Sequence, residues 1–166
     1  TIEKGFLYIP IKGQRFDGHD FISSVFEKGA VCTLTEHYDE NLAFPQIVVD
    51  STSAALRDIA EYYRSLFKNL TVIGVSGSSG KTSTKEMICS VLSEHFNVLK
   101  TEGNLNNEIG VPKTIFRINE EHNVAVIEMG INHFGEMTRL AKMVRPDIAV
   151  ITNIGTAHLE FLESRD

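Results

Sequence analysis

The chain has 166 residues, 42% of them apolar and 23% charged, a composition typical of folded proteins that excludes a disordered or fibrous chain. Its 22 acidic and 16 basic residues give a formal charge of −6, and without a Lys/Arg cluster we expect no nucleic acid as a partner. No apolar run approaches the roughly 20 residues of a membrane span, so we expect no membrane partner. Cys32 and Cys89 are far apart in the sequence and predict free thiols in the cytoplasm.

The first third of the chain predicts a small α/β unit. Short apolar runs between turn residues indicate strands at 6–9, 30–34 and 46–49. Apolar residues at helical spacing predict a helix over 18–28, ended by Gly29. Ser51 or Thr52 can cap a second helix that extends through Leu66. We expect this helix to close the first domain, so that the domains are 1–68 and 69–166.

Beyond a polar hinge at Lys68-Asn69, strands and helices alternate. Strands are expected at 70–75, 97–99, 124–127 and 148–151, and helices at 81–95, 111–118 and 135–144. This alternation predicts an α/β fold with a doubly wound, mostly parallel sheet.

The segment between the strand at 70–75 and the helix at 81–95 has the pattern of a phosphate-binding loop of the P-loop type. It reads Gly-Val-Ser-Gly-Ser-Ser-Gly-Lys-Thr over 74–82, in which glycines let backbone N–H groups face an anion, the lysine reaches phosphate and the threonine ligates Mg²⁺. Val75 stands where the usual loop has its first glycine, and Gly74 is one residue early. The expected phosphate-binding residues are Gly77, Ser78, Ser79, Gly80, Lys81, Thr82 and Ser83. The alternative reading is a Gly/Ser-rich turn with an incidental lysine.

An acidic residue, Glu128, directly follows the apolar run 124–127. It therefore stands at the carboxyl end of an expected buried strand, where open α/β sheets bind ligands. A surface carboxylate at a strand end is the alternative.

Three further motifs lie at 103–112 (GNLNNEIGVP), 128–136 (EMGINHFGE) and 152–160 (TNIGTAHLE). Together with the shifted phosphate loop, and with 13–21 (GQRFDGHDF) and 49–52 (VDST) in the first unit, they resemble the Mur ligases of peptidoglycan synthesis. The resemblance is greatest to members that join D-alanyl-D-alanine to UDP-N-acetylmuramoyl-tripeptide, and it spans nearly the whole chain.

The resemblance implies an ATP-dependent, ADP-forming ligase. ATP phosphorylates the substrate carboxylate, the amine attacks the acyl-phosphate, and phosphate leaves, with positioning and charge neutralisation as the main catalytic contributions. It implies catalytic roles for Lys81, Glu128 and His158, with Thr82, Glu128 and His158 as Mg²⁺ ligands. From its own sequence position, His158 is equally well an ordinary loop histidine.

The resemblance also assigns substrate-binding residues. In the first unit, which would bind the UDP moiety, these are Phe16, Asp17, Gly18, His19 and Thr52, and in the second unit they are Asn104, Asn106, Asn107 and Asn132. Without the family, the asparagines are turn formers, and 16–20 is a loop with a helix cap.

Family members continue well beyond the last motif, so we expect this chain to be a fragment of the enzyme that does not turn over by itself. The sequence leaves the oligomeric state open, and we expect a monomer for the parent protein. Another Mur-type amide ligase, a P-loop phosphotransferase or NTPase, and a binding module without catalysis remain alternatives.

Overall fold

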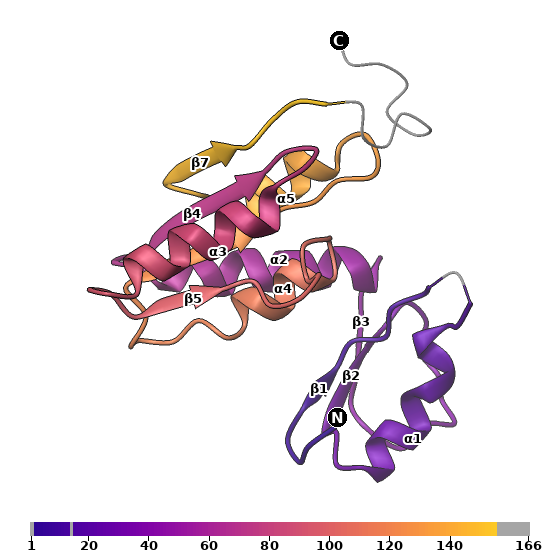
Figure 1. The fold of residues 1–166 in the computed structure, drawn as a ribbon. Helices are drawn as coiled ribbons and strands as arrows, with labels where there is room; N and C mark the ends of the chain where they lie inside the picture. Colours follow the sequence, from indigo (N-terminus) through magenta and orange to yellow (C-terminus); the bar gives the residue numbers. More distant parts are fainter. Residues whose placement is uncertain (1, 14, 156–166) are drawn as a thin grey trace. The chain divides into compact units, whose positions relative to one another are not determined.

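The computed structural model describes residues 2–13 and 15–155. It divides the chain into two compact units, Thr1–Leu56 and Arg57–Asp166, and each unit has its own parallel sheet (Figure 1). The α/β class expected from the alternation of strands and helices is confirmed. Within the described residues, no helix is both long enough and apolar enough to cross a membrane.

The first unit is a three-stranded sheet with one covering helix. Its strands are β1 (Leu7–Tyr8), β2 (Cys32–Thr35) and β3 (Gln46–Val48), paired in the order β1-β2-β3 and all parallel. A 3₁₀ turn, η1 (Gly18–Phe21), leads into α1 (Ile22–Glu27). Ile22 and Val25 of this helix are buried, as are Ala30 and Leu34, so a single turn of apolar spacing suffices to form the small core.

The long helix α2 (Thr52–Leu66) begins in the first unit and continues into the second. The expected domain boundary at 68/69 therefore differs from the division at 56/57 in the structure. The reason lies in packing: Ala60 is fully buried in the second unit's core, and Tyr63 and Phe67 pack against it. In addition, the Tyr63 hydroxyl donates to the Ile118 carbonyl at 2.8 Å.

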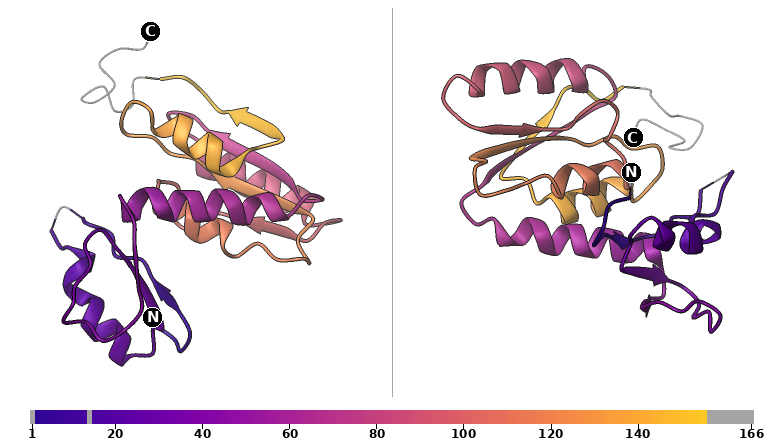
Figure 2. Two further views of the ribbon diagram at one scale, coloured as in Figure 1. Left: turned by 180° about the vertical axis from the view of Figure 1, so that it is seen from behind. Right: turned by 90° about the horizontal axis from the view of Figure 1, so that it is seen from below.

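The second unit is a parallel sheet in the order β5-β6-β4-β7. Its strands are β4 (Thr71–Ser76), β5 (Val98–Lys100), β6 (Val124–Glu128) and β7 (Ile148–Ile151). Its helices are α3 (Lys81–Leu92), α4 (Gly110–Ile115) and α5 (Glu136–Val144). The doubly wound arrangement is confirmed: α3 covers one face, whereas α2, α4 and α5 cover the other (Figure 2).

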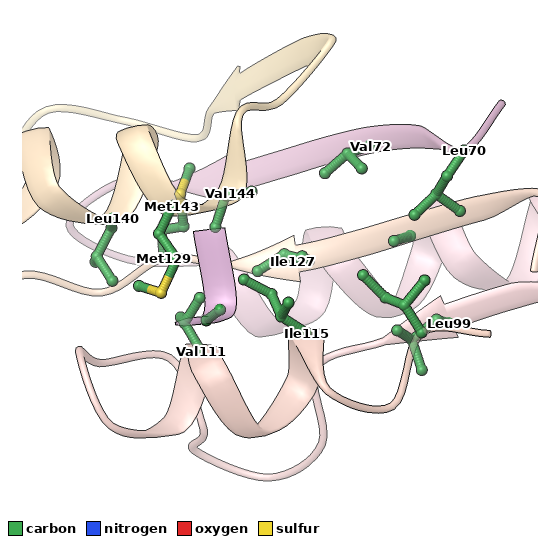
Figure 3. Close-up of a cluster of buried hydrophobic side chains, with 13 residues drawn as sticks. Leu70, Val72, Leu99, Val111, Ile115, Ile127, Met129, Leu140, Met143 and Val144 are labelled. Atoms are coloured by element: carbon green, nitrogen blue, oxygen red, sulfur yellow. The ribbon is translucent and has the colours of Figure 1, made fainter. Parts of the chain in front are cut away.

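Side chains of the central strands alternate between the two faces of the sheet and so contribute to two separate apolar cores. On the face with three helices, Val72, Ala125 and Ile127 pack with residues of α4 and α5 (Figure 3). On the other face, Ile73, Val75, Val124 and Val126 pack against Cys89 of α3. Strands covered on both faces have continuous apolar sequences, which is why the sequence predicts β4 and β6.

The register of the sheet places the candidate site. Val75 is paired with Glu128 and Ser76 with Ile151, so the carboxyl ends of β4, β6 and β7 meet at one edge. The phosphate loop follows β4, the acidic residue ends β6, and the segment after β7 begins there. Ligands bind at this edge in open α/β sheets.

Candidate nucleotide site and substrate pocket

The loop between β4 and α3 contains two glycines with positive φ, Gly77 and Gly80. Gly77 has φ +135°, and a Cβ there would lie 2.1 Å from Thr152 Oγ1 and 3.0 Å from the Asn153 nitrogen. Gly80 has φ +77° and directly precedes α3, but a Cβ there would meet no atom within 4 Å. Gly77 is thus required by space as well as by conformation, whereas Gly80 is required by conformation only.

The segment after β7 supports this loop. The Ser78 N–H donates to the Asn153 carbonyl at 3.1 Å, and the Ser79 N–H donates to Asn153 Oδ1 at 2.9 Å. Asn153 Nδ2 donates to Ser79 Oγ at 3.0 Å, and the Gly155 N–H donates to Ser78 Oγ at 2.8 Å. Sequence reasoning named the motif at 152–160 but did not assign Asn153 a role; pairing of β7 next to β4 is what brings it to the loop.

Lys81 and Thr82 are the first residues of α3, as the loop pattern requires. Lys81 Nζ donates to the Gly77 carbonyl at 2.7 Å, so the lysine side chain folds back over the loop. The Thr82 hydroxyl donates to Glu128 Oε2 at 3.0 Å. Ser83 is exposed in the same helical turn. The helix N-terminus and the ammonium group together present the N–H donors and positive charge that suit an anion.

Glu128 is not a surface carboxylate: it is only 2% exposed. Thr82 contacts its Oε2, and Asn106 Nδ2 donates to its Oε1 at 2.8 Å. Its N–H donates to Thr101 Oγ1 at 3.0 Å. A buried carboxylate requires such partners because burial penalises its charge.

Three of the four asparagines expected to bind substrate lie in one loop but have different surroundings. Asn106 reaches Glu128 and accepts from the Gly130 N–H through its carbonyl at 2.8 Å. Asn107 Oδ1 instead accepts from the Gly110 N–H at 2.8 Å, which caps the start of α4. Asn104 is exposed, and its carbonyl accepts from the Asn106 N–H. Only Asn106 is therefore brought to Glu128 by a contact of its own.

Asn132 lies in the exposed turn before α5. Its N–H donates to Glu136 Oε2 at 2.6 Å, and the His133 N–H donates to the same atom at 3.1 Å. Burial raises the pKa of Glu136, but these bonds outweigh it and leave the pKa below its ordinary value. The geometry gives Asn132 a role in shaping this turn.

Lys85, which sequence reasoning missed, is 1% exposed and lies next to Glu128. Its Nζ donates to the Thr101 carbonyl at 2.8 Å and is 3.8 Å from Glu128 Oε2. The available signal was its position in α3, four residues after Lys81 and so on the same helical face.

A cavity of about 420 Å³ opens beside the phosphate loop. Gly77, Ser78 and Lys81 line one part of it, and apolar side chains, among them Met129 and Met137, line another. Room for a group larger than phosphate therefore exists next to the anion-binding residues.

The residues fit a shared Mg²⁺ site better than a cage made of protein alone. Within 2–13 and 15–155, no group of three or more His, Cys, Asp or Glu side chains could hold a metal ion. Mg²⁺ is commonly held by one or two protein oxygens together with phosphate and water, and the adjacent oxygens of Thr82 and Glu128 suit that role. His158, the third expected ligand, lies outside the described residues.

In the first unit, Asp17 and His19 line a cavity of about 370 Å³ together with Glu36 and His37. Asp17 Oδ1 accepts from the His19 N–H at 3.0 Å and lies 2.6 Å from His19 Nδ1. The bond from the His19 N–H is the main cause that lowers the pKa of Asp17. Among the described residues, His19 Nε2 is the buried side-chain polar atom without a hydrogen-bond partner, which leaves it for a ligand.

The other expected substrate residues of this unit are Gly18, Thr52 and Phe16, and their surroundings differ. Gly18 fits tightly, since a Cβ there would lie 2.5 Å from the Ile11 nitrogen. Thr52 is buried, and its N–H donates to Glu36 Oε1 at 2.9 Å. Phe16 is 73% exposed. The structure thus brings Asp17 and His19 to the cavity and connects Thr52 to it only through Glu36.

Two family models match consecutive parts of the chain. One describes the Mur ligase family, catalytic domain, and matches residues 1–77, and the other describes the Mur ligase middle domain and matches residues 75–166.

Curated relatives and solved structures agree with these matches. The UDP-N-acetylmuramoyl-tripeptide–D-alanyl-D-alanine ligase of Bacillus subtilis is 44% identical over 170 residues, which cover 99% of this chain and 36% of the relative. A crystal structure of MurF from Acinetobacter baumannii superimposes with a TM-score of 0.94 at 43% identity, covering 99% of this chain and 36% of that one. The MurF ligase of Thermotoga maritima in complex with ADP has a TM-score of 0.90 at 38% identity, covering 99% and 38%.

The chain therefore spans about a third of the length of these relatives (36% in the Bacillus subtilis ligase). The middle-domain match includes the phosphate loop from Val75 onward, together with Glu128 and the Asn106 loop. The fold, the order of the motifs and the matched relatives agree: this chain belongs to the Mur ligase family.

Proposed function

We propose that this chain supplies the UDP-substrate domain and the phosphate-binding part of the ATP domain of a cytoplasmic ligase that adds D-alanyl-D-alanine to UDP-N-acetylmuramoyl-tripeptide. The observation that carries the proposal is the contact between Thr82 and the buried Glu128 at the end of β6. It joins a phosphate loop to a carboxylate that can share a metal ion with phosphate. The identity to tripeptide–D-alanyl-D-alanine ligases, 44% for that of Bacillus subtilis, favours this substrate pair.

In this proposal, the loop and the start of α3 hold the phosphates of ATP. Gly77, Ser78, Ser79 and Gly80 form the cradle, the Lys81 ammonium group binds the β- and γ-phosphates, and Thr82 and Ser83 continue it into the helix. Thr82 and Glu128 would hold Mg²⁺, which would supply neutralisation of the phosphate charge. The chemistry of the family then needs little from the protein besides positioning.

The γ-phosphoryl group passes to the carboxylate of UDP-N-acetylmuramoyl-tripeptide, and ADP leaves. The amine of D-alanyl-D-alanine attacks the resulting acyl-phosphate, which forms the amide and releases phosphate. We assign the tripeptide end to Asn104, Asn106, Asn107 and Asn132, and a second metal or acyl-phosphate contact to His158. Asn106 has the strongest support because it contacts Glu128 directly.

The UDP end of the substrate is assigned to the cavity of the first unit, with Phe16, Asp17, Gly18, His19 and Thr52. Asp17 orients the His19 ring, and the unpartnered His19 Nε2 is available to a ligand. Phe16 is exposed and could cover a planar base by stacking.

A phosphotransferase or NTPase would use the same loop, and another Mur-type ligase would use the same fold. Acceptor dependence separates a ligase from a phosphotransferase or NTPase, because a ligase releases ADP only when both the acid and the amine substrate are present. The amine that is accepted separates this ligase from another Mur-type ligase. For the parent protein we expect a monomer.

Calorimetric titration of the 166-residue chain with UDP-N-acetylmuramoyl-tripeptide tests the proposal, with UDP-glucose as the control and with Mg²⁺-ATP added in a second series. Selective binding of the tripeptide substrate is the expected result. Equal binding of UDP-glucose would remove the substrate assignment, and failure of folded chain to bind ATP or ADP would remove the nucleotide site.

A further inference from the structure

Lys85 carries a positive charge inside the second unit, where no solvent compensates it. The side chain is 1% exposed although it belongs to a residue type that is almost never fully buried without a partner. A group of this kind requires a reason, because removing an ammonium group from water is costly unless it is paired and hydrogen-bonded.

The partners of Lys85 connect α3 with the ends of β5 and β6. Its Nζ donates to the Thr101 carbonyl at 2.8 Å and lies 3.8 Å from Glu128 Oε2. Thr101 is fully buried, and its Oγ1 accepts from the Glu128 N–H. Lys85, Thr101 and Glu128 therefore contact one another in a closed set.

The carboxylate of Glu128 receives a different group on each oxygen. Asn106 binds Oε1, whereas Thr82 binds Oε2, the oxygen nearest to Lys85. Thr82 and Lys85 are three residues apart on α3 and so share a helical face. The helix thus presents a hydroxyl and an ammonium group to one carboxylate oxygen.

From this geometry we infer that Lys85 is a positioning residue: it holds the Glu128 carboxylate in place for the Mg²⁺ that accompanies the nucleotide. The inference rests on the proposed function, because it assumes that Thr82 and Glu128 share a metal ion with phosphate. Lys85 does not touch the nucleotide; it acts through Glu128.

Lys85 would act on the metal ion indirectly, through its contact with Glu128. Groups that orient metal ligands commonly change metal affinity when they are removed, by about 10- to 100-fold. Lys85 also contacts Glu86 Oε1 at 3.2 Å, but Glu86 is exposed and pairs with Lys100 as well. Neutralising Glu86 therefore removes a contact of Lys85 without disturbing Glu128.

The experiment measures two quantities on the 166-residue chain. One is the affinity for ADP in EDTA, and the other is the Mg²⁺ concentration that half-saturates the ADP-bound chain, here called the Mg²⁺ midpoint. Lys85→Met should raise the Mg²⁺ midpoint about 10- to 100-fold and leave the ADP affinity in EDTA unchanged. Glu86→Gln is the matched control for a lost contact of Lys85. Cys89→Ala, one turn further along the buried face of α3, is the control for lost packing. Both should keep the wild-type midpoint.

An unchanged Mg²⁺ midpoint in folded Lys85→Met would overturn the inference. A parallel loss of ADP affinity in EDTA would also overturn it, because Lys85 would then support the loop in general. Absence of ADP binding in the wild-type chain would instead remove the proposed function, and the inference with it.

If Lys85→Met does not fold, the single variant Glu128→Gln is compared with the double variant Glu128→Gln, Lys85→Met. The double variant should fold because it contains no unpaired buried charge. The two should have equal Mg²⁺ midpoints and equal ADP affinities in EDTA. A weaker ADP affinity of the double variant would contradict the assignment of Lys85 to Glu128.

Discussion

The phosphate loop of the second unit and the cavity of the first unit hold their polar groups in different ways. In the loop, backbone geometry sets the shape: Gly77 has no room for a side chain, and Asn153 binds two successive loop residues. In the cavity, carboxylate side chains accept from backbone N–H groups: Asp17 accepts from His19, and Glu36 accepts from Thr52.

This difference indicates where each site is sensitive. A backbone cradle is sensitive to one added atom, because a Cβ at Gly77 would meet Thr152 and Asn153, the segment that also binds the Ser78 and Ser79 N–H groups. A substitution in a cavity lined by side chains removes the contacts of one side chain, and each lost hydrogen bond costs only about 1 kcal/mol.

The largest expected effect is at Gly77. Gly77→Ala should destabilise the second unit by about 3 kcal/mol or more, through overpacking and backbone strain, and abolish ADP binding. Gly80→Ala meets no atom within 4 Å and should cost only about 1–2 kcal/mol from its positive φ. Urea unfolding and ADP titration measure both. Equal losses in the two variants would refute the distinction between the glycines.

Lys81→Met should weaken ADP binding about 10- to 150-fold, because hydrogen bonds to charged groups contribute about 1.5–3 kcal/mol. The free energy of unfolding should stay close to that of the wild type, since within residues 2–13 and 15–155 the Lys81 ammonium group is held by a hydrogen bond to the Gly77 carbonyl. Lys113→Met, at an exposed position of α4, is the charge-matched control. A similar loss of affinity in the control would point to general electrostatics.

In the first unit, Asp17→Ala should weaken binding of UDP-N-acetylmuramoyl-tripeptide about fivefold, the equivalent of one hydrogen bond of about 1 kcal/mol. Loss of the cap on η1 should cost about 1 kcal/mol of stability. Asp20→Ala removes a neighbouring exposed carboxylate and should change neither quantity. Unchanged substrate affinity in Asp17→Ala would separate this cavity from the UDP site.

The smallest effect concerns Glu36 and pH. The hydrogen bond from the Thr52 N–H is the main cause that lowers the pKa of Glu36. Because the folded pKa lies below the unfolded one, ionised Glu36 stabilises the unit above the unfolded pKa, and this contribution disappears as the pH falls through the folded pKa. Glu36→Gln should therefore be less stable than the wild type at neutral pH, by less than about 1 kcal/mol at this half-exposed group.

Thermal unfolding of the wild type and Glu36→Gln from neutral to acidic pH measures this difference, which should vanish in acid. A difference that grows as the pH falls would have the opposite sign and would contradict the pKa shift.

Much of the second unit was predictable because its information is local. Continuous apolar runs predicted β4 and β6, and the Gly/Ser-rich segment before Lys81 predicted the phosphate loop. The carboxyl end of β6 predicted the position of Glu128, since strand ends gather at one edge.

What escaped prediction depends on contacts between distant segments. Lys85 reads as an ordinary helical lysine until β5 and β6 are paired beside α3. Asn107 and Asn106 are adjacent in sequence, yet one caps α4 and the other binds Glu128. The helix at 52–66 was expected to close the first unit, but the packing of Ala60 assigns its second half to the other core.

The central claim is that this chain has a nucleotide site in its second unit and a separate UDP-substrate site in its first. Amide chemical shifts of the ¹⁵N-labelled chain, titrated separately with Mg²⁺-ADP and with UDP-N-acetylmuramoyl-tripeptide, test it directly. ADP should shift the signals of 77–83 and Glu128. The UDP substrate should shift those of Asp17, His19 and Glu36 through its UDP end, and that of Asn106 through its tripeptide end. Shifts of the phosphate loop by the UDP substrate, with no change around His19, would contradict the claim.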